Sequence, residues 1–320
     1  MGTRLLPPLA AFLFLGLAIA LAPFFAVRAQ TSPAYLALGD SLAYGVGATD
    51  PAAQGYVPLI AGALRQSGRY GAVGLDVVNL GAPGAQSADL VAAGGQLERA
   101  LQVIADRRAS NGPGVEIISL DVGGNDLLAL ATRDSPCFAE AAGDVCRQQL
   151  GQMLSSLQRD LGRALRELRQ AAPNAAVYVL DLYNPYSGAG DPREVIADIA
   201  VQQVNGVIAA VVADPQLNVR PARVYELFQG HGQQWIAADG IHPNDSGHAV
   251  IAEVFLAAIE GRPVAIPDRL LGPSAGAAGQ RSGAGSGGDD TTLLLAIAVP
   301  LSFLAGALVS GAYFFARGRS

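Results

Sequence analysis

Four short motifs occur in a fixed order along the chain and contain the residue types that acyl transfer requires. They are Gly39-Asp40-Ser41, Asn79-Leu80-Gly81-Ala82-Pro83-Gly84, Gly123-Gly124-Asn125-Asp126 and Asp239-Gly240-Ile241-His242. Ser41 offers a hydroxyl nucleophile, which attacks efficiently only when a base removes its proton. His242 is the candidate base, and Asp239 could accept a hydrogen bond from the far ring nitrogen and fix its tautomer. These residue types indicate the nucleophilic chemistry of a serine hydrolase.

The same motifs contain donors for the oxyanion of a tetrahedral intermediate. Such an intermediate carries negative charge on oxygen, so fixed N–H groups must meet it. The candidates are the Ser41 backbone N–H, a glycine N–H from the second motif and the Asn125 side-chain amide. Glycine suits a backbone that approaches a substrate closely because it has no Cβ. These considerations do not choose between Gly81 and Gly84.

Each motif taken alone has a plainer interpretation. Gly-Asp-Ser and Gly-Gly-Asn-Asp are common turn sequences, and the loop after Asp239 could simply cap the last helix through Asn244 or Asp245. All four motifs in order, each at a strand end or a helix start, would be an unusual coincidence. Their joint occurrence therefore favours one shared site.

The set of motifs resembles the SGNH or GDSL-type hydrolase family, whose four sequence blocks contribute Ser, Gly, Asn and His. Ser41 matches the first block within Gly-Asp-Ser-Leu-Ala-Tyr-Gly, and Asn125 matches the third. Asp239 and His242 match the last block. The resemblance thus assigns the same roles to these four residues as the chemistry above.

The second block shows where the resemblance adds to the residues. The family's glycine lies some residues past the strand in a Ser-Gly-like or Pro-Gly-like turn, so the resemblance places this role on Gly84 and keeps Gly81 in reserve. It covers about residues 34–260 and implies the SGNH hydrolase fold with esterase, lipase or related acylhydrolase activity. The expected mechanism needs no metal or organic cofactor.

Short apolar runs alternate with helical patterns through the middle of the chain. Strands are expected over residues 34–38, 75–79, 115–120, 176–180 and, more weakly, 222–225. Helices are expected over residues 56–66, 95–108, 147–171, 193–213 and 246–260. This alternation implies a parallel sheet with helices on both faces, and the resemblance makes it a flavodoxin-like α/β/α sandwich with five strands. Ligands of such sheets bind at the carboxyl ends of the strands, where the motifs begin.

The N-terminal run is expected to be removed from the mature protein. Residues 5–27 are uncharged and lead into Val27-Arg28-Ala29, which favours a secretory signal peptide over residues 1–29. An uncleaved N-terminal anchor is the alternative, because the run is long enough to span a bilayer. The catalytic domain is then expected over residues 30–268.

The C-terminal part of the chain predicts a membrane anchor. Residues 269–290 are mostly Gly, Ser and Ala, which is typical of a flexible linker. Residues 291–316 contain no charge and are expected to form a transmembrane helix. The arginines of the tail, 317–320, place it in the cytoplasm. The prediction is a single-pass cell-membrane protein with its catalytic domain on the extracytoplasmic side.

Charge and cysteine content narrow the function further. The formal net charge is −6 without a basic patch, which argues against nucleic acid as a partner. All 21 basic residues are arginine, so Schiff-base lysine chemistry, a P-loop lysine and Ser-Lys dyads are excluded. Cys137 and Cys146 are the only cysteines, and in an exported domain they predict one local disulfide. Two buried free thiols are the alternative.

Other conspicuous residues have plainer interpretations. His231 and His248 are expected to be a loop residue and a helix-start residue, because no cluster with metal-ligand spacing accompanies them. Trp235 could contact a sugar or an acyl group, and core packing is an equal alternative. Tyr44 and Tyr56 are expected to pack instead of lining a pocket.

The sequence as a whole predicts an exported, membrane-tethered serine acylhydrolase. Its substrate is expected to be a lipid ester or an acyl ester, such as O-acetyl, of a surface glycan. The segment 127–149, which contains both cysteines, is expected to overhang the site as a wall or lid. The alternative from another class is a catalytically silent cell-surface binding module on the same fold.

Overall fold

The structure is a computed structural model that describes residues 32–140, 143–190 and 192–271. The predicted signal peptide, the transmembrane run, the cytoplasmic tail and all but the first three residues of the predicted linker lie outside these residues. All four motifs lie within the described part of the chain.

Five parallel strands form one sheet in the order β2-β1-β3-β4-β5. Their bounds are Ala34–Leu38 for β1, Asp76–Asn79 for β2, Val115–Leu120 for β3, Ala176–Leu180 for β4 and Val219–Ala222 for β5. This is the strand order of flavodoxin-like sheets, in which the chain changes direction across the sheet between the first and third strands. The predicted fold class is confirmed.

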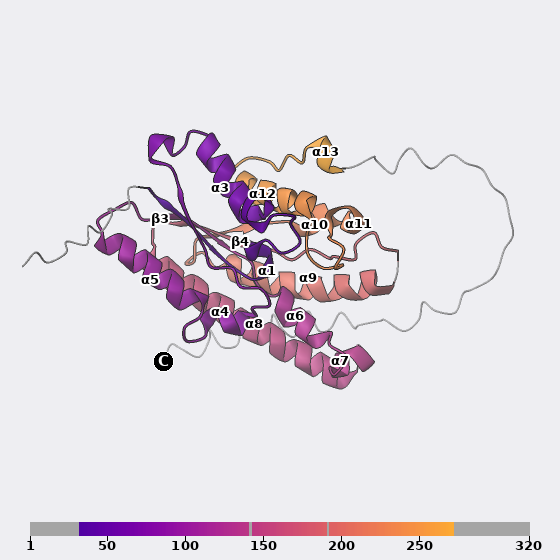
Figure 1. Cartoon of the computed structure of the whole chain (residues 1–320). Helices are drawn as coiled ribbons and strands as arrows, with labels where there is room; N and C mark the ends of the chain where they lie inside the picture. The colour runs from indigo at the N-terminus through magenta and orange to yellow at the C-terminus, as the bar shows by residue number, and fades with distance from the viewer. Residues whose placement is uncertain (1–31, 141–142, 191, 272–320) are drawn as a thin grey trace, which may run out of the picture.

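Helices cover both faces of the sheet (Figure 1). α3 (Tyr56–Gln66) and α12 (Asp245–Glu260) pack on one face, and α5 (Gln96–Ala109), α8 (Asp144–Ala171) and α9 (Pro192–Val212) pack on the other. Shorter helices are α1 (Ser41–Tyr44), α2 (Pro51–Gln54), α4 (Ser87–Val91), α6 (Gly124–Leu130), α7 (Pro136–Ala139), α10 (Tyr225–Phe228), α11 (Gly232–Trp235) and α13 (Asp268–Leu271), with a 3-10 turn over Gly71–Val73. The five long helices begin and end within three residues of their predicted bounds.

Alternating side chains of the central strands build two separate cores. On β1, Leu36 and Leu38 face the α5, α8 and α9 side, whereas Tyr35 and Ala37 face the α3 and α12 side. Successive side chains of a strand point to opposite faces of a sheet, so a strand covered on both faces is apolar throughout. Every residue of β1 is accordingly buried. The rigid centre of the sheet therefore carries the loop that begins at Gly39.

The fifth strand was predicted three residues too late along the chain. β5 is Val219–Ala222 and contains Pro221, which an edge strand tolerates because one side of its backbone needs no ladder partner. The backbone N–H groups of Val224 and Tyr225 instead donate to Asp181 Oδ1, at 2.6 and 3.0 Å, where α10 begins. These two hydrogen bonds to the Asp181 side chain end the strand before Val224 and Tyr225, which the prediction had placed in it.

One helix among the described residues is long and apolar enough, by length and composition, to cross a membrane. It is α9, Pro192–Val212. Val201, Val204 and Ile208 on this helix are buried in the core between α9 and the sheet. One face of α9 therefore packs on the sheet, whereas Val195 and Ile196 near its start are exposed.

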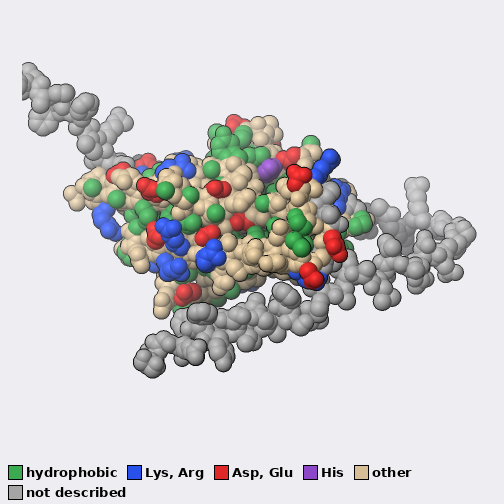
Figure 2. Space-filling view, turned by 90° about the horizontal axis from the view of Figure 1, so that it is seen from below, with side chains coloured by type: hydrophobic (Ala, Val, Ile, Leu, Met, Phe, Trp, Pro, Cys, Tyr) green, Lys and Arg blue, Asp and Glu red, His purple; other side chains and the backbone are tan. Residues whose placement is uncertain are grey.

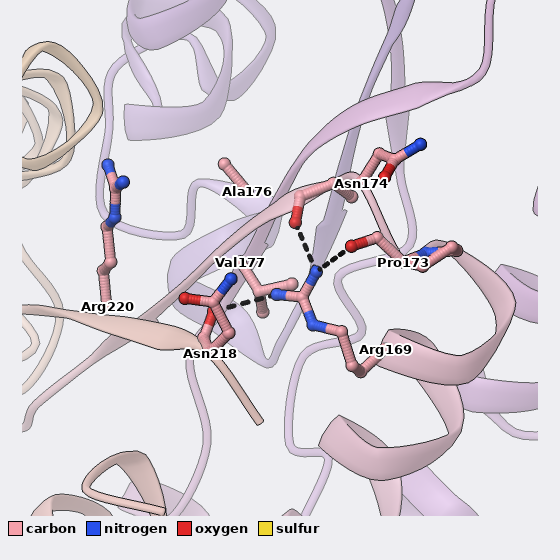
Figure 3. A pocket seen from close by; sticks show the side chains of 8 residues that line it. Arg169, Pro173, Asn174, Ala176, Val177, Asn218 and Arg220 are labelled. Atoms are coloured by element: carbon pink, nitrogen blue, oxygen red, sulfur yellow. Dashed lines mark hydrogen bonds between the residues drawn. The ribbon is translucent and has the colours of Figure 1, made fainter. Parts of the chain in front are cut away.

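A hollow of about 330 Å³ lies at the edge of the sheet where β4 and β5 begin. Figure 3 shows Arg169 at its centre, donating to surrounding carbonyl oxygens. Its guanidinium donates to the carbonyls of Leu217, Pro173, Ala175 and Asn218 at 2.8 to 2.9 Å. This hollow is at the opposite end of the strands from the four motifs, and its arginine ties α8 to the starts of two strands.

Acidic and basic side chains are interspersed on the face of the molecule drawn in Figure 2. No single sign of charge dominates that face. It offers no extended basic stripe of the kind that a nucleic-acid backbone requires.

Candidate active site

Ser41 begins a single helical turn directly after the central strand β1. Asp40 precedes α1 as its N-cap, and its carboxylate accepts a hydrogen bond from the Leu42 N–H at 2.9 Å. A side-chain cap of this kind satisfies a donor that the helix start would leave unpaired. The Ser41 N–H has no acceptor in the described part of the chain. Both the hydroxyl and the N–H of Ser41 therefore lie at the carboxyl end of β1.

Three side chains from distant parts of the chain form one hydrogen-bonded line. His242 Nε2 lies 2.9 Å from Ser41 Oγ, across 201 residues of sequence. His242 Nδ1 lies 2.7 Å from Asp239 Oδ2. Both distances are within the range that proton transfer to and from a serine hydroxyl requires. The structure thus brings together the three residues predicted as nucleophile, base and orienting acid.

Asp239 is held in its ionised form by donors from its own loop. Burial alone would raise the pKa of Asp239, but the N–H groups of Ile241 and His242 and the His242 ring outweigh burial and lower that pKa. Both N–H groups donate to Oδ1 at 2.9 Å, which leaves Oδ2 for the histidine ring. A carboxylate placed in this way can stabilise an imidazolium.

Several contacts fix the loop that carries His242. Tyr183 donates from its hydroxyl to the Ile241 carbonyl at 2.8 Å, and Asn244 caps α12 by accepting from the Gly247 N–H at 3.1 Å. Gly47 lies directly against this loop: a Cβ there would be 2.3 Å from the Pro243 carbonyl oxygen. Its φ is +92°, in a region that favours glycine. Sequence reasoning missed Gly47 and Tyr183, whose contacts depend on how distant loops meet.

The two glycines of the second motif differ in their hydrogen bonds. The Gly81 N–H donates to Asn79 Oδ1 at 2.9 Å, and a Cβ at Gly81 would lie 2.7 Å from the Tyr44 nitrogen. The Gly84 N–H has no acceptor in the described part of the chain, and its φ of +81° is left-handed. Gly81 therefore lets the loop pack against α1. Gly84 keeps the N–H that is open to a ligand.

Asn125 joins the first and third motifs to the residue that follows the second. It lies in the first turn of α6, and its Nδ2 donates to Asp40 Oδ2 and to the Ala85 carbonyl, both at 3.1 Å. Because an amide nitrogen carries two hydrogens, both are engaged in this structure. The next residue, Asp126, accepts from the N–H and hydroxyl of Ser87 and so anchors α4. The third motif therefore holds the segment directly after the second motif in place, as well as facing the site.

The remaining conspicuous residues lie in the core or in loops. Both His248 ring nitrogens meet backbone groups, at Tyr56 N and Val46 O, and burial lowers the His248 pKa. Trp235 is buried and donates to the Leu270 carbonyl, so of the two alternatives for it, core packing is correct. His231 stacks on Trp235.

The two tyrosines near the motifs, Tyr44 and Tyr56, differ in their exposure to solvent. Tyr56 is fully buried, whereas Tyr44 is about half exposed, so packing accounts for Tyr56 only. Tyr44 ends the helical turn that Ser41 begins.

Cys137 and Cys146 form a disulfide, which confirms the predicted pairing. It joins α7 to the first turn of α8. In the view of Figure 1, α7 lies at the lower right end of the molecule and α1 near its centre. No group of three or more His, Cys, Asp and Glu side chains that could hold a metal ion occurs in residues 32–140, 143–190 and 192–271.

Comparison with known proteins agrees with the geometry of the site. The sequence model of the GDSL-like lipase/acylhydrolase family matches residues 37–250, which include all four motifs. The chain belongs to this family. Its members are carboxylic ester hydrolases, and the family match confirms the resemblance found in the four motifs.

Individual relatives have low sequence identity to this chain. The spore germination lipase LipC of Bacillus licheniformis is 26% identical over 152 residues, which are 46% of this chain and 65% of that protein. A lipase from a goat rumen metagenome has a TM-score of 0.55 at 21% identity, covering 71% of this chain and 97% of its own. Phospholipase A1 from Streptomyces albidoflavus has a TM-score of 0.52 at 21% identity, covering 73% and 100%. At these identities the two structures show the shared fold.

Proposed function

We propose that the protein is a serine acylhydrolase in which Ser41 forms an acyl-enzyme with a carboxylic ester. The observation that carries this proposal is the hydrogen-bonded line from Ser41 Oγ through the His242 ring to Asp239, with both distances below 3 Å. Ser41 and His242 are separated by 201 residues, and the fold alone brings them together. Asp239 Oδ1 also accepts from the Ile241 and His242 N–H groups at 2.9 Å. In the described part of the chain, Asp239 Oδ2 and the His242 ring make their hydrogen bonds only along this line.

The first half of the reaction transfers the acyl group to the enzyme. Ser41 Oγ attacks the ester carbonyl carbon while His242 Nε2 takes the hydroxyl proton, and Asp239 stabilises the imidazolium that results. The tetrahedral intermediate collapses, the carbon–oxygen bond to the alcohol breaks, and His242 returns its proton to the departing alkoxide. Water then attacks the acyl-enzyme by the same steps, with His242 as base, and releases the acid and free Ser41.

The oxyanion is met by three N–H groups. The backbone N–H groups of Ser41 and Gly84 support this assignment because neither has an acceptor in the described part of the chain. Asn125 contributes its amide by exchanging its bond to the neutral Ala85 carbonyl for the charged oxygen, while it keeps its bond to Asp40. Bonds to an anion are stronger than neutral ones, so the exchange is favourable once charge develops.

The substrate is proposed to be a lipid ester or an O-acyl ester of a surface glycan. The names of the related spore germination lipase and of the phospholipase A1 support the first, and a tether near the cell surface makes both reachable. The enzyme is proposed to be exported and held by residues 291–316 in the membrane. The Cys137–Cys146 disulfide supports an oxidising compartment.

The test uses a fluorophosphonate probe and a panel of esters on the purified protein. We expect the probe to label the wild type and not Ser41→Ala, and the panel of acyl chains and acetylated glycans to identify the preferred ester. Ser41→Ala and His242→Ala should lose hydrolysis while keeping the wild-type melting temperature, because Ser41→Ala removes a single hydroxyl and His242 is a partly exposed loop residue. Wild-type turnover by Ser41→Ala would disprove the proposed nucleophile.

A further inference from the structure

We propose that Asp121 is a positioning residue that holds the Gly39-Asp40-Ser41 turn, and through that turn the Ser41 hydroxyl and the Asn125 amide, in the reactive arrangement. Asp121 follows the last residue of β3, and Ser41 follows β1, its neighbour in the sheet. The proposal rests on the function proposed above, in which Ser41 is the nucleophile.

The turn lies directly on the Asp121 carboxyl group. The Asp40 N–H donates to Asp121 Oδ2 at 2.8 Å, and the Tyr56 hydroxyl donates to Oδ1 at 2.5 Å. Asp121 is fully buried, and a Cβ on Gly39 would be 2.4 Å from its carboxyl carbon. Gly39 also has a φ of +150°. The first glycine of the turn is therefore the residue that allows the carboxyl group to reach the Asp40 N–H.

The side chain of Asp40 connects the turn to Ser41, to the start of α1 and to Asn125. Its Oδ2 accepts from Asn125 Nδ2 at 3.1 Å, and its Oδ1 accepts from the Leu42 N–H at 2.9 Å and lies 3.4 Å from Ser41 Oγ. A shift of the Asp40 backbone would thus move the α1 cap, the nucleophile and the amide together. Asp121 touches neither the nucleophile nor a substrate, and acts through Asp40.

The Gln96 side chain forms a second clamp on the same turn. Gln96 accepts from the Gly39 N–H at 2.8 Å and donates to the Gly39 carbonyl at 2.7 Å. This clamp fixes Gly39 but makes no hydrogen bond to the Asp40 N–H. That N–H has no acceptor other than Asp121 in the described part of the chain. The Asp40 carbonyl accepts from the Tyr44 N–H within the α1 turn at 3.2 Å, so Asp121 is the group that ties the Asp40 backbone to the neighbouring strand.

Burying this carboxyl group is energetically unfavourable. Desolvation and the neighbouring Asp40 charge raise the pKa of Asp121 well above its usual range, and desolvation also raises the pKa of Asp40. An apolar side chain would fill the end of β3 without this cost. The hydrogen bond to the nucleophile turn gives the carboxyl group a role that an apolar residue could not perform.

The neighbouring strand offers a matched control. Asp181 follows β4 as Asp121 follows β3, and it accepts from two backbone N–H groups, at Val224 and Tyr225. Its contacts anchor α10 and do not reach the nucleophile turn. Removing the acceptor at Asp181 thus imposes a similar structural loss away from Ser41.

The test compares Asp121→Asn and Asp121→Leu, which share a shape and differ in hydrogen-bonding capacity. Asparagine can accept from Asp40 N–H and donate to the Tyr56 hydroxyl, so we expect kcat within about threefold of wild type. Leucine cannot, and misplacement of the turn should lower kcat by about 100-fold with KM changed by less than about twofold. Asp181→Leu should lower the melting temperature but leave kcat unchanged.

Equal kcat in Asp121→Leu and wild type would overturn the proposal, and so would an equal loss of kcat in Asp181→Leu. If Asp121→Leu does not fold, Asp121→Ala takes its place with the same expectations. Hydrogen–deuterium exchange supplies a readout that needs no activity: the peptide spanning residues 38–45 should exchange faster in Asp121→Leu only. If wild type hydrolyses no ester, the proposed function fails, whereas unchanged exchange in that peptide would reject Asp121 alone.

Discussion

At the scale of single residues, Asn125 is where positioning and catalysis meet. Its amide bonds Asp40 and Ala85 in this structure, and the proposed mechanism requires it to face the oxyanion as well. Asn125→Ala should therefore lower kcat by about 100- to 1000-fold with little change in KM, because the amide meets charge that develops only during reaction. It should also lower the free energy of unfolding by about 1 kcal/mol through the two lost bonds.

The measurement combines kinetics with urea unfolding on one preparation of each variant. Asn205→Ala is the control, because Asn205 also makes two side-chain bonds to backbone, both to Leu182, and none to Ser41, Asp239 or His242. It should be destabilised with unchanged kcat. Near-normal kcat in a destabilised Asn125→Ala would remove Asn125 from the oxyanion site.

Asp121 should also make stability depend on pH. Its pKa in the folded protein is raised well above the value of about 3.9 for an unfolded chain, mainly by desolvation and then by Asp40. The stability associated with protonated Asp121 is therefore fully present below about pH 4 and is lost as pH rises through the folded pKa. Asp121→Asn does not ionise, so it should not lose this stability. The free energy of unfolding of Asp121→Asn minus that of the wild type should therefore increase as pH rises, by up to about 1.4 kcal/mol per pH unit.

Urea unfolding of wild type and Asp121→Asn at about pH 5, 7 and 9 measures this difference. A difference between the two proteins that stays constant over this range would show that Asp121 keeps an ordinary pKa. The comparison needs no substrate and is independent of the catalytic role of Ser41.

The residues of the site were predictable to different extents. Ser41, Asn125 and His242 could be found because their types and order along the chain carry chemistry that few other arrangements provide. Asp121 could not, because a single aspartate after an apolar strand has many possible roles. Its role depends on the closeness of Gly39, which the packing of β1 beside β3 alone determines.

At the scale of elements, periodicity predicted the long helices and the buried strands, and the surrounding contacts decided the rest. Helices of four residues such as α1 and α7 span about one turn and leave no repeat in the sequence. The bounds of β5 could not be predicted for a different reason. The Asp181 side chain accepts a hydrogen bond from the backbone after Ala222, and a proline lies within the strand. Local pattern alone contains neither fact.

The disulfide between α7 and α8 should act locally. It closes a loop between residues nine apart, so its loss should lower the free energy of unfolding by up to about 3 kcal/mol on the chain-entropy view. Cys137→Ser with Cys146→Ser should therefore lower the melting temperature, whereas kcat on a short ester should stay within about twofold because the bridge does not contact Ser41 or His242. Thermal unfolding with and without reductant measures the effect in the wild type.

The double variant itself is the control for the reductant, because it has no disulfide to lose. Its melting temperature should not respond to added reductant. A large fall in kcat on the short ester would instead show that α7 helps to shape the active site. That result would agree with the prediction that residues 127–149 form a wall or lid over it.

At the scale of the whole molecule, the strand order places the site. In a 2-1-3-4-5 sheet, the loops after β1 and β3 diverge toward opposite faces and leave a crevice at the carboxyl ends of the strands. Ser41 follows β1, and Asn125 follows β3. Strand-helix alternation was enough to predict this edge as the site, because right-handed crossovers allow few other arrangements.

The last prediction concerns where this domain resides. If residues 291–316 anchor an exported enzyme, deletion of residues 291–320 should move esterase activity from the membrane fraction to the medium, with unchanged kcat because the family match ends at residue 250. Protease added to intact cells should release an active fragment of the full chain by cutting between residues 272 and 290, a stretch of mostly Gly, Ser and Ala. Cells expressing Ser41→Ala control for background esterases. Activity that stays with protease-treated cells, or a deletion variant that remains with the cells, would contradict anchoring by residues 291–316 alone.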